Sequence, residues 1–238
     1  MSVPAATIRK QLRALASPET AAILQRFFKT GPGEYGEGDV FLGIKVPPLR
    51  ALAKQHRDAD LDTIASLLDS RYHEERLFAL LLLMQFYQAG DTPGQQAACD
   101  LYLARTQRIN NWDLVDISAP HIVGRHLQDR SRKVLHTLAR SPMLWERRIA
   151  IIATFHFIRL GDFADTLRIA GILLHDEHDL MHKAVGWMLR EIGKRDLTVE
   201  EGFLLRHYHS MPRTMLRYAI ERFPEQRRID FLHGTARE

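Results

Sequence analysis

The sequence is almost without cysteine, and it lacks any long hydrophobic run. Cys99 is the only cysteine among 238 residues, so an internal disulfide is excluded and a disulfide-stabilised secreted scaffold is disfavoured. The longest unbroken apolar run, residues 77–84, is far shorter than the ~20 residues that a membrane span requires. The N-terminal segment also lacks the apolar stretch of a secretory signal. We therefore expect a cytoplasmic protein without a membrane partner.

Acidic and basic residues are distributed unevenly along the chain. Residues 1–120 carry 13 Lys and Arg against 14 Asp and Glu, whereas residues 121–238 carry 20 against 15, which together give the net charge of +4. A sequence pI near 9.3 with the excess in one half suits a polyanionic partner. A basic surface that serves only solubility explains the same charge equally well.

Nearly the whole chain shows a helical period, and no stretch shows the sustained alternation of a strand. Prolines fall where helices should begin, and Ser or Thr before proline is a typical helix start because proline lacks only an N–H that would be unpaired there. These starts are Pro18, Pro48, Pro93, Pro142 and Pro212. The pattern predicts helices at about 46–57, 61–69, 73–89, 93–107, 112–125, 129–139, 142–159, 162–175, 178–194, 198–210 and 212–222.

Small residues recur at similar places in successive helices. Ala79, Ala150, Gly186 and Ala219 are 71, 36 and 33 residues apart, and Ala119 falls inside the first interval. Steps in the thirties with two helices each are typical of an α-solenoid, in which small residues allow close stacking. The sequence therefore predicts an all-α, HEAT-like solenoid of paired antiparallel helices with a basic concave face.

One Gly-rich, acidic segment, residues 31–43, interrupts the helices. It cannot be a phosphate-binding loop, because Gly-Lys-Ser/Thr is missing and Glu34, Glu37 and Asp39 would repel phosphate. We interpret it as a long ordered or semi-ordered loop within a single domain over 1–238, in which N-terminal helices and this loop occupy 1–45 and the repeats occupy 46–238.

The helix predicted at 178–194 has one apolar side that packs and one side of unusual composition. That second side places Trp187 among cations, namely Lys183, Arg190 and Lys194, with Glu191 at the edge. An aromatic side chain among cations suits a surface that binds phosphates and stacks on a sugar or base. A cation–π pair, or a tryptophan that packs under the next helix, fits the pattern as well.

The segment NNWDLVDISAP, residues 110–120, carries the other candidate group. Asn111 should cap a helix, which places Trp112 and Asp113 in the first turn, where a carboxylate such as that of Asp113 complements the helix dipole. Asp116 lies one turn further on, beneath Trp112. This carboxylate has no such explanation, so we interpret it as functional, with a solvated surface residue as the alternative.

Three histidines, His175, His178 and His182, lie close together in the sequence. HDLMH at 178–182 resembles the metalloprotease pattern His-Glu-x-x-His, but with Asp in place of Glu and with no convincing third ligand. We expect no metal site and no cofactor.

Four segments taken together resemble the AlkD-like DNA alkylation repair family. They cover the chain from about residue 20 to 222 and read FFKTGPGEYGEGDVFLGIKVP, NNWDLVDISAP, WERRIAI and KAVGWMLREIGK. The resemblance implies a HEAT-like solenoid whose concave face holds duplex DNA and which excises cationic N3- and N7-alkylpurines. It implies duplex DNA with alkylated bases as the partner, and we expect a monomer with no obligate protein partner.

The resemblance also implies roles for individual residues. Matched by motif, the catalytic carboxylate is Asp116, the two tryptophans that contact the sugar are Trp112 and Trp187, and the active-site arginine is Arg148. The neighbouring Arg147 is the alternative for the arginine. Further DNA contacts are implied for Phe27, where the family often has Tyr, and are expected from the basic helix residues Lys183, Arg190 and Lys194.

Two other functions compete with a glycosylase. One is a non-catalytic solenoid that recognises distorted or branched DNA, and the other is a protein-interaction scaffold, the commonest task of HEAT-like repeats. Asp116 favours the enzyme, because a protein that only binds DNA gains nothing from a carboxylate facing phosphates. Salt dependence separates DNA binding from the scaffold, because only binding to phosphates should weaken steeply with salt.

Overall fold

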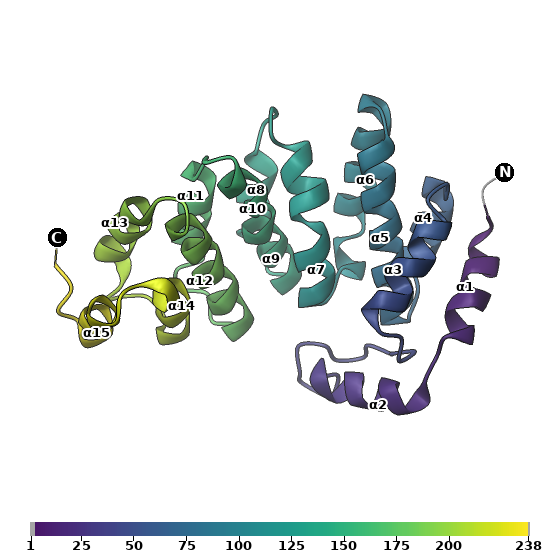
Figure 1. The fold of residues 1–238 in the computed structure, drawn as a ribbon, viewed down its shortest axis with the longest axis horizontal. Helices are drawn as coiled ribbons and strands as arrows, with labels where there is room; N and C mark the ends of the chain where they lie inside the picture. Colours follow the sequence, from purple (N-terminus) through teal and green to yellow (C-terminus); the bar gives the residue numbers. More distant parts are fainter. Residues whose placement is uncertain (1–2, 238) are drawn as a thin grey trace. The chain divides into compact units, whose positions relative to one another are not determined.

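A computed structural model describes residues 3–237 of the chain, and its regular elements are helices (Figure 1). Within this range the only β-pairing is one isolated bridge between Val40 and Tyr72, so the all-α prediction is confirmed. No helix in the described part is long and apolar enough to cross a membrane. The chain divides into two compact units, Met1–Ser118 (unit 1) and Ala119–Glu238 (unit 2). The basic concave face stays a prediction.

Unit 1 is built around one long buried helix. This helix, α5, packs against α3, α4, α6 and α7, and every residue from 73 to 83 is buried. The elements of unit 1 are α1 (Ala5–Ala14), α2 (Pro18–Phe27), α3 (Val46–Gln55), α4 (Leu61–Leu68), α5 (His73–Ala89), α6 (Thr92–Ala104), η1 (Thr106–Arg108) and α7 (Trp112–Ser118).

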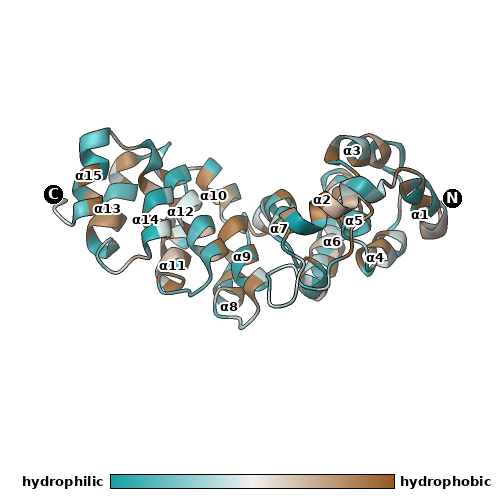
Figure 2. Cartoon of the chain, turned by 90° about the horizontal axis from the view of Figure 1, so that it is seen from below, coloured by the Kyte–Doolittle hydropathy of each residue, from teal (hydrophilic) through white to brown (hydrophobic). Residues whose placement is uncertain are grey.

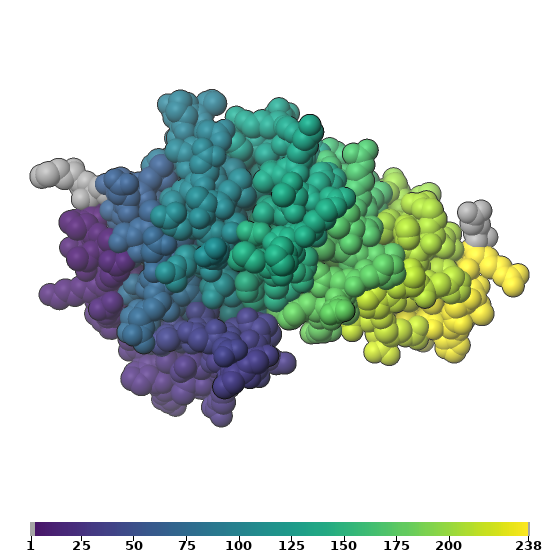
Figure 3. Space-filling model, turned by 180° about the vertical axis from the view of Figure 1, so that it is seen from behind, coloured from purple at the N-terminus to yellow at the C-terminus, as the bar shows by residue number. Residues whose placement is uncertain are grey.

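In unit 2 the helices follow one another in sequence order, as the green-to-yellow half of Figure 3 shows. Its elements are η2 (Pro120–Gly124), α8 (Lys133–Leu138), α9 (Leu144–Ala153), α10 (Phe155–Arg159), α11 (Ala164–Ile172), α12 (Asp179–Gly193), α13 (Leu197–His207), α14 (Arg213–Ala219), η3 (Ile220–Arg222) and α15 (Glu225–His233). Helix α12 packs against α9, α13 and α14. Most helices carry both hydrophilic and hydrophobic residues, as expected for helices that bury one face (Figure 2).

A glycine allows the helices α12 and α14 of unit 2 to pack closely. A Cβ at Gly186 on α12 would lie 2.4 Å from the Met215 carbonyl oxygen and 3.2 Å from the Ala219 backbone nitrogen on α14. No larger residue fits that space without movement of the backbone. The prediction that recurrent small residues serve close helix packing is confirmed at this position.

Several predicted helices are shorter or broken in the structure. The helix expected over 112–125 ends at Ser118, because Pro120 has no N–H to continue the α-helical bonds, and the chain continues as the π-helical turn η2. The helix expected over 142–159 is divided near Thr154, whose hydroxyl donates to the Ile151 carbonyl oxygen at 2.6 Å. Helix α15 had not been predicted.

Candidate functional site

Trp112 stands at the first residue of α7, where it is partly exposed. Its ring stacks on Phe28 at 5.3 Å between centroids, and Phe28 stacks in turn on Phe41 at 5.1 Å. Phe27, which is 62% exposed, approaches Trp112 edge-on at 6.1 Å. The structure thus brings together two of the predicted site residues, Phe27 and Trp112, on an aromatic support.

Asp116 lies one turn after Trp112 on the same helix and is also partly exposed. Burial raises the pKa of the Tyr102 phenol on α6, and the nearby carboxylate of Asp116 raises it further. The Tyr102 hydroxyl lies 2.9 Å from the Ser118 hydroxyl, which donates to the Leu114 carbonyl oxygen at 2.5 Å. Asp116 therefore stands on a helix whose C-terminal turn is held to α6 by buried polar contacts.

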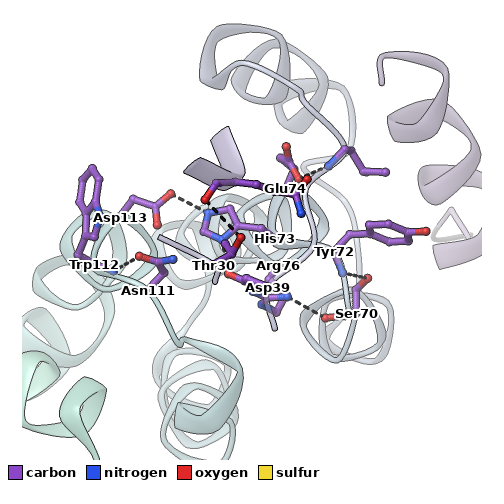
Figure 4. A network of polar contacts seen from close by, with 12 residues as sticks. Thr30, Asp39, Ser70, Tyr72, His73, Glu74, Arg76, Asn111, Trp112 and Asp113 are labelled. Carbon is purple, nitrogen blue, oxygen red and sulfur yellow. Dashed lines mark hydrogen bonds and ion pairs between the residues drawn. The ribbon is translucent and has the colours of Figure 1, made fainter. Parts of the chain in front are cut away.

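Asp113 has a role beyond the helix dipole, which corrects the sequence interpretation. Its Oδ2 atom lies 2.8 Å from Nε2 of His73, and Nδ1 of the same ring lies 3.0 Å from Oδ2 of Asp39 (Figure 4). His73 is 2% exposed and stacks on Phe41 at 4.5 Å. One buried imidazole thus connects the Gly-rich loop to the helix that carries Trp112 and Asp116.

The charges of this network stabilise one another. Burial alone would lower the pKa of His73, but Asp113 and Asp39 outweigh it and raise the pKa to about 9. Burial would raise the pKa of Asp39, yet the hydrogen bond from His73 and the charge of Arg76 lower it. Arg76 also pairs directly with Asp39 and donates to the Ser70 carbonyl oxygen at 3.1 Å. At neutral pH His73 is therefore an imidazolium that donates to a carboxylate from each nitrogen.

The neighbouring Glu74 fixes the end of the Gly-rich loop. Its buried carboxylate accepts hydrogen bonds from three consecutive backbone N–H groups, those of Leu42 at 2.8 Å, Gly43 at 2.8 Å and Ile44 at 3.1 Å. Gly43 has a φ of 82°, and a Cβ there would lie 2.0 Å from the Ser17 carbonyl oxygen, so this position requires glycine. The acidic loop is therefore ordered and anchored to α5.

Sequence reasoning missed this buried network. The network joins residues that are far apart in the sequence. His73 lies 34 residues after Asp39 and 40 residues before Asp113, so local periodicity could not relate them. The one available signal was the run of four charged or ionisable residues, 73–76, that opens an otherwise apolar helix.

In unit 2, Trp187 is partly exposed on α12, as its place on the polar side of the helix predicts. Its indole Nε1 donates to Oε1 of Glu191 at 3.2 Å, and its ring lies 6.0 Å from that of Phe155. Glu191, expected only at the edge of this surface, is buried and also accepts from Lys194 at 2.5 Å.

The cations expected to bind DNA are paired with carboxylates in this structure. The pairs are Lys183 with Asp179 at 2.6 Å, Lys194 with Glu191 at 2.5 Å, Arg147 with Asp176 at 2.6 Å, and Arg190 with Glu221. Partly exposed ion pairs contribute little energy, so phosphate can compete for such cations. The polar side of α12 nevertheless carries less uncompensated charge than its sequence suggests, and its role in DNA binding stays a prediction.

The two candidate active-site arginines have different surroundings. Arg148 is 5% exposed and donates from Nη1 to the Leu180 carbonyl oxygen at 2.7 Å, which ties α9 to the first turn of α12. Arg147 is partly exposed and, besides Asp176, contacts the carbonyl oxygens of Ser141 at 3.1 Å and Pro142 at 3.0 Å. Arg148 exposes little surface to a phosphate, so the choice between the two stays open.

Two of the three clustered histidines have structural contacts, whereas His175 is exposed. Nδ1 of His178 accepts the Leu180 backbone N–H at 3.1 Å and so caps α12, and burial lowers the pKa of this ring. Nε2 of His182 contacts the Asp176 carbonyl oxygen. Within residues 3–237, no three or more His, Cys, Asp or Glu side chains form a group that could hold a metal ion.

The fold and these residues define an all-helical repeat protein with a partly exposed tryptophan in each unit. A family model described as DNA alkylation repair enzyme matches residues 8–223, so the chain belongs to this family. No curated protein is similar enough to match the chain.

Two solved structures share this fold at low sequence identity. An Enterococcus faecalis protein, described as a predicted DNA alkylation repair enzyme, is 19% identical, with 88% of this chain and 97% of that chain covered and a TM-score of 0.68. AlkD2 from Streptococcus mutans is 15% identical, with 87% and 98% covered and a TM-score of 0.53. These similarities confirm the helical-repeat fold that the resemblance implies.

Proposed function

We propose that this member of the DNA alkylation repair family is a monofunctional DNA glycosylase. It hydrolyses the N-glycosidic bond of cationic N3- and N7-alkylated purines in duplex DNA and has no lyase activity. The observation that carries the proposal is the placement of Asp116 one turn from Trp112 on α7, with both side chains partly exposed. Family membership supports a role in DNA repair.

A single carboxylate suffices for this reaction. Ordinary glycoside hydrolysis uses a second carboxyl group as an acid for the leaving group. An alkylated purine already carries a positive charge and leaves as a neutral base, so it needs no acid. Asp116 then stabilises the oxocarbenium-like sugar and orients or deprotonates the attacking water. At about 4 Å and an effective dielectric constant near 20, the attraction is about 4 kcal/mol, or roughly a thousandfold in rate.

The tryptophans and cations would hold the duplex. The faces of Trp112 and Trp187 supply CH–π and cation–π contacts to the sugar as it becomes positive. Phe27 beside Trp112 adds apolar contact, and Arg148 or Arg147 holds a phosphate near the lesion. The same scheme assigns backbone phosphates to the other cations, Lys183, Arg190 and Lys194. The proposed reaction uses no metal ion and no redox cofactor. In this proposal the chain acts as one domain and as a monomer, in the cytoplasm and on the nucleoid.

The test measures release of free base from a duplex that carries one N7-methylguanine. We expect Asp116→Asn to slow release by about two to three decades, a loss of ~3–4 kcal/mol, because the charge acts mainly in the transition state. Binding to undamaged duplex should hold or tighten. Asp100→Asn, at an exposed carboxylate on α6 of the same unit, is the matched control and should release base at the wild-type rate.

Three outcomes would contradict the proposal. Wild-type rates in Asp116→Asn would remove the catalytic assignment. Binding of the duplex by the wild-type protein with no release of base would replace the glycosylase with a non-catalytic DNA-binding protein, and failure to bind DNA at all would favour the protein-interaction scaffold.

A further inference from the structure

Four basic side chains gather in unit 2 on two neighbouring short elements. His121 and Arg125 come from the η2 region, and His156 and Arg159 come from α10. All four side chains are at least partly exposed. We call these four residues the basic patch. None of them was a candidate in the sequence, and none has been assigned a role above.

The π-helical turn and a glycine create the patch. The Gly124 backbone N–H bonds to the Ala119 carbonyl oxygen at 2.9 Å, which is the five-residue step of a π-helical turn. A Cβ at Gly124 would lie 2.3 Å from the Ala153 carbonyl oxygen and 2.8 Å from Cβ of His156. The turn therefore lies directly against the start of α10, which places the two pairs of basic residues together.

The charges within the patch repel one another. Burial lowers the pKa of His121, and Arg159 and Arg125 lower it further. Burial also lowers the pKa of His156, again with contributions from Arg125 and Arg159, and then from His121 and the more distant Arg132. These effects agree with the packing of η2 against α10, which brings the two pairs of basic residues together. In the free protein at neutral pH the two histidines are therefore neutral.

The arginines of the patch have no acidic partner. Across residues 3–237, neither Arg125 nor Arg159 forms an ion pair, in contrast to the paired cations on α12. Nε2 of His156 lies 2.9 Å from Oε1 of Gln128, a neutral side chain. Neither guanidinium of the patch is therefore engaged in an ion pair that an anion would have to break.

The patch adjoins Trp187. The guanidinium carbon of Arg159 lies 4.2 Å from the centre of the Phe155 ring, which is 6.0 Å from the ring of Trp187. From the turn that follows α12, Arg195 also faces Phe155 at 6.0 Å. The carboxylate of Glu191 is already shared by Trp187, Lys194 and Arg195. An anion bound at the patch therefore lies beside the tryptophan proposed to contact the sugar.

We infer that the basic patch binds the phosphate backbone of duplex DNA beside Trp187, and that His121 and His156 take up protons when it does. The inference rests on the proposed function only in taking duplex DNA as the ligand. A phosphate between the arginines and the rings reverses the local potential, so it favours the protonated form of each histidine. By linkage, DNA affinity then rises as pH falls through the range in which the rings titrate.

The first experiment measures the affinity for an undamaged duplex by fluorescence anisotropy between pH 5.5 and 8.0 at constant ionic strength. Each proton taken up strengthens binding about tenfold for every unit by which pH falls within its titration range. Two histidines together therefore strengthen binding by up to about a hundredfold per pH unit. The double variant His121→Gln/His156→Gln should lose this pH dependence and keep the weaker affinity seen at high pH. His233→Gln, at an exposed histidine on α15, is the matched control and should behave as the wild type does.

The second experiment measures the salt dependence of the same affinity. Replacing Arg125 and Arg159 together by Gln should lower the log–log slope by about two, because each phosphate contact contributes roughly 0.9. NMR titration of the histidine rings provides a reading that does not depend on affinity. The pKa values of His121 and His156 should rise when the duplex is added.

The inference is overturned if the wild-type affinity does not change with pH, or if the double histidine variant keeps the full pH dependence. It is also overturned if the salt slope is unchanged after both arginine substitutions. The pKa values of the two rings could also rise as much with inorganic phosphate alone as with the duplex. That result would assign the site to free phosphate and would refute binding of the DNA backbone. The base-release assay is independent. If base is not released but duplex binding shows this pH dependence, the inference about the basic patch is supported and the proposed glycosylase activity is rejected.

Discussion

The buried imidazolium of His73 should make the stability of the protein fall between neutral and alkaline pH. Its pKa is raised from 6.5 to about 9 in the folded protein. Because the folded-state pKa lies above the unfolded one, the stabilisation is fully present below about pH 6.5 and is lost as pH rises through about 9. At about 1.36 kcal/mol for each pH unit between these limits, the contribution is about 3 kcal/mol.

The assay is urea unfolding at a series of pH values from 6.5 to 9.5, with the free energy of unfolding extrapolated to water. Glu200 in unit 2 complicates this window, because burial raises its pKa to about 9 and so also makes stability fall with rising pH. The experiment is therefore done in a Glu200→Gln background. There we expect a slope near −1.4 kcal/mol per pH unit, which His73→Gln should abolish and Asp113→Asn should reduce.

A flat stability profile above pH 6.5 in the Glu200→Gln background would refute the reasoning, because His73 would then be neutral in the folded protein. An unchanged slope in His73→Gln would assign the effect to another group. A decrease of the slope in Asp113→Asn, with far-UV circular dichroism unchanged, would show that Asp113 acts through His73 and not only on the helix dipole.

Three further predictions follow from the packing and the site. Gly186→Ala should destabilise the protein by about 1–3 kcal/mol in thermal unfolding, because the alanine Cβ would lie 2.4 Å from the Met215 carbonyl oxygen. Wild-type stability of this variant would contradict the close packing of α12 on α14. Trp187→Ala should weaken duplex binding by about 1–3 kcal/mol while Trp187→Phe retains part of it, and equal losses would argue against stacking. Release of N7-methylguanine should survive prolonged chelation, whereas a loss restored by zinc would show that His178 and His182 bind a metal.

The sequence was sufficient to predict helices wherever apolar residues recur with a helical period. Such recurrence reflects burial of one face, which is a local property that tertiary packing reinforces. The same reasoning placed Trp187 on the polar side of α12. It was less accurate at helix ends. It predicted one helix through Pro120, where the structure has a π-helical turn at Pro120–Gly124.

The electrostatics of the site could not be predicted from the sequence. The sequence does not show whether a basic side chain is paired with a carboxylate or free to bind phosphate. The partner of Arg190, for example, is Glu221, which comes from a different element. Likewise, Asp113 fits a helix start so well that nothing in its neighbourhood indicates a buried histidine forty residues earlier. The family resemblance implied separate DNA contacts for Phe27 and Trp112, but no pattern in the sequence predicted that their rings lie 6.1 Å apart.

The three backbone hydrogen bonds that Glu74 accepts from residues 42–44 also bear on how this part of the chain can change during evolution. They fix the strand-like end of the Gly-rich segment, while the stack of Phe28 on Trp112 fixes its beginning. With both ends held independently, the exposed part of the turn at residues 32–34 can gain or lose residues at a small entropic cost. Gly36 is buried, and a Cβ there would lie 2.5 Å from the Phe28 carbonyl oxygen. Insertions and deletions should therefore accumulate in that turn, while Glu74 and Gly43 resist replacement.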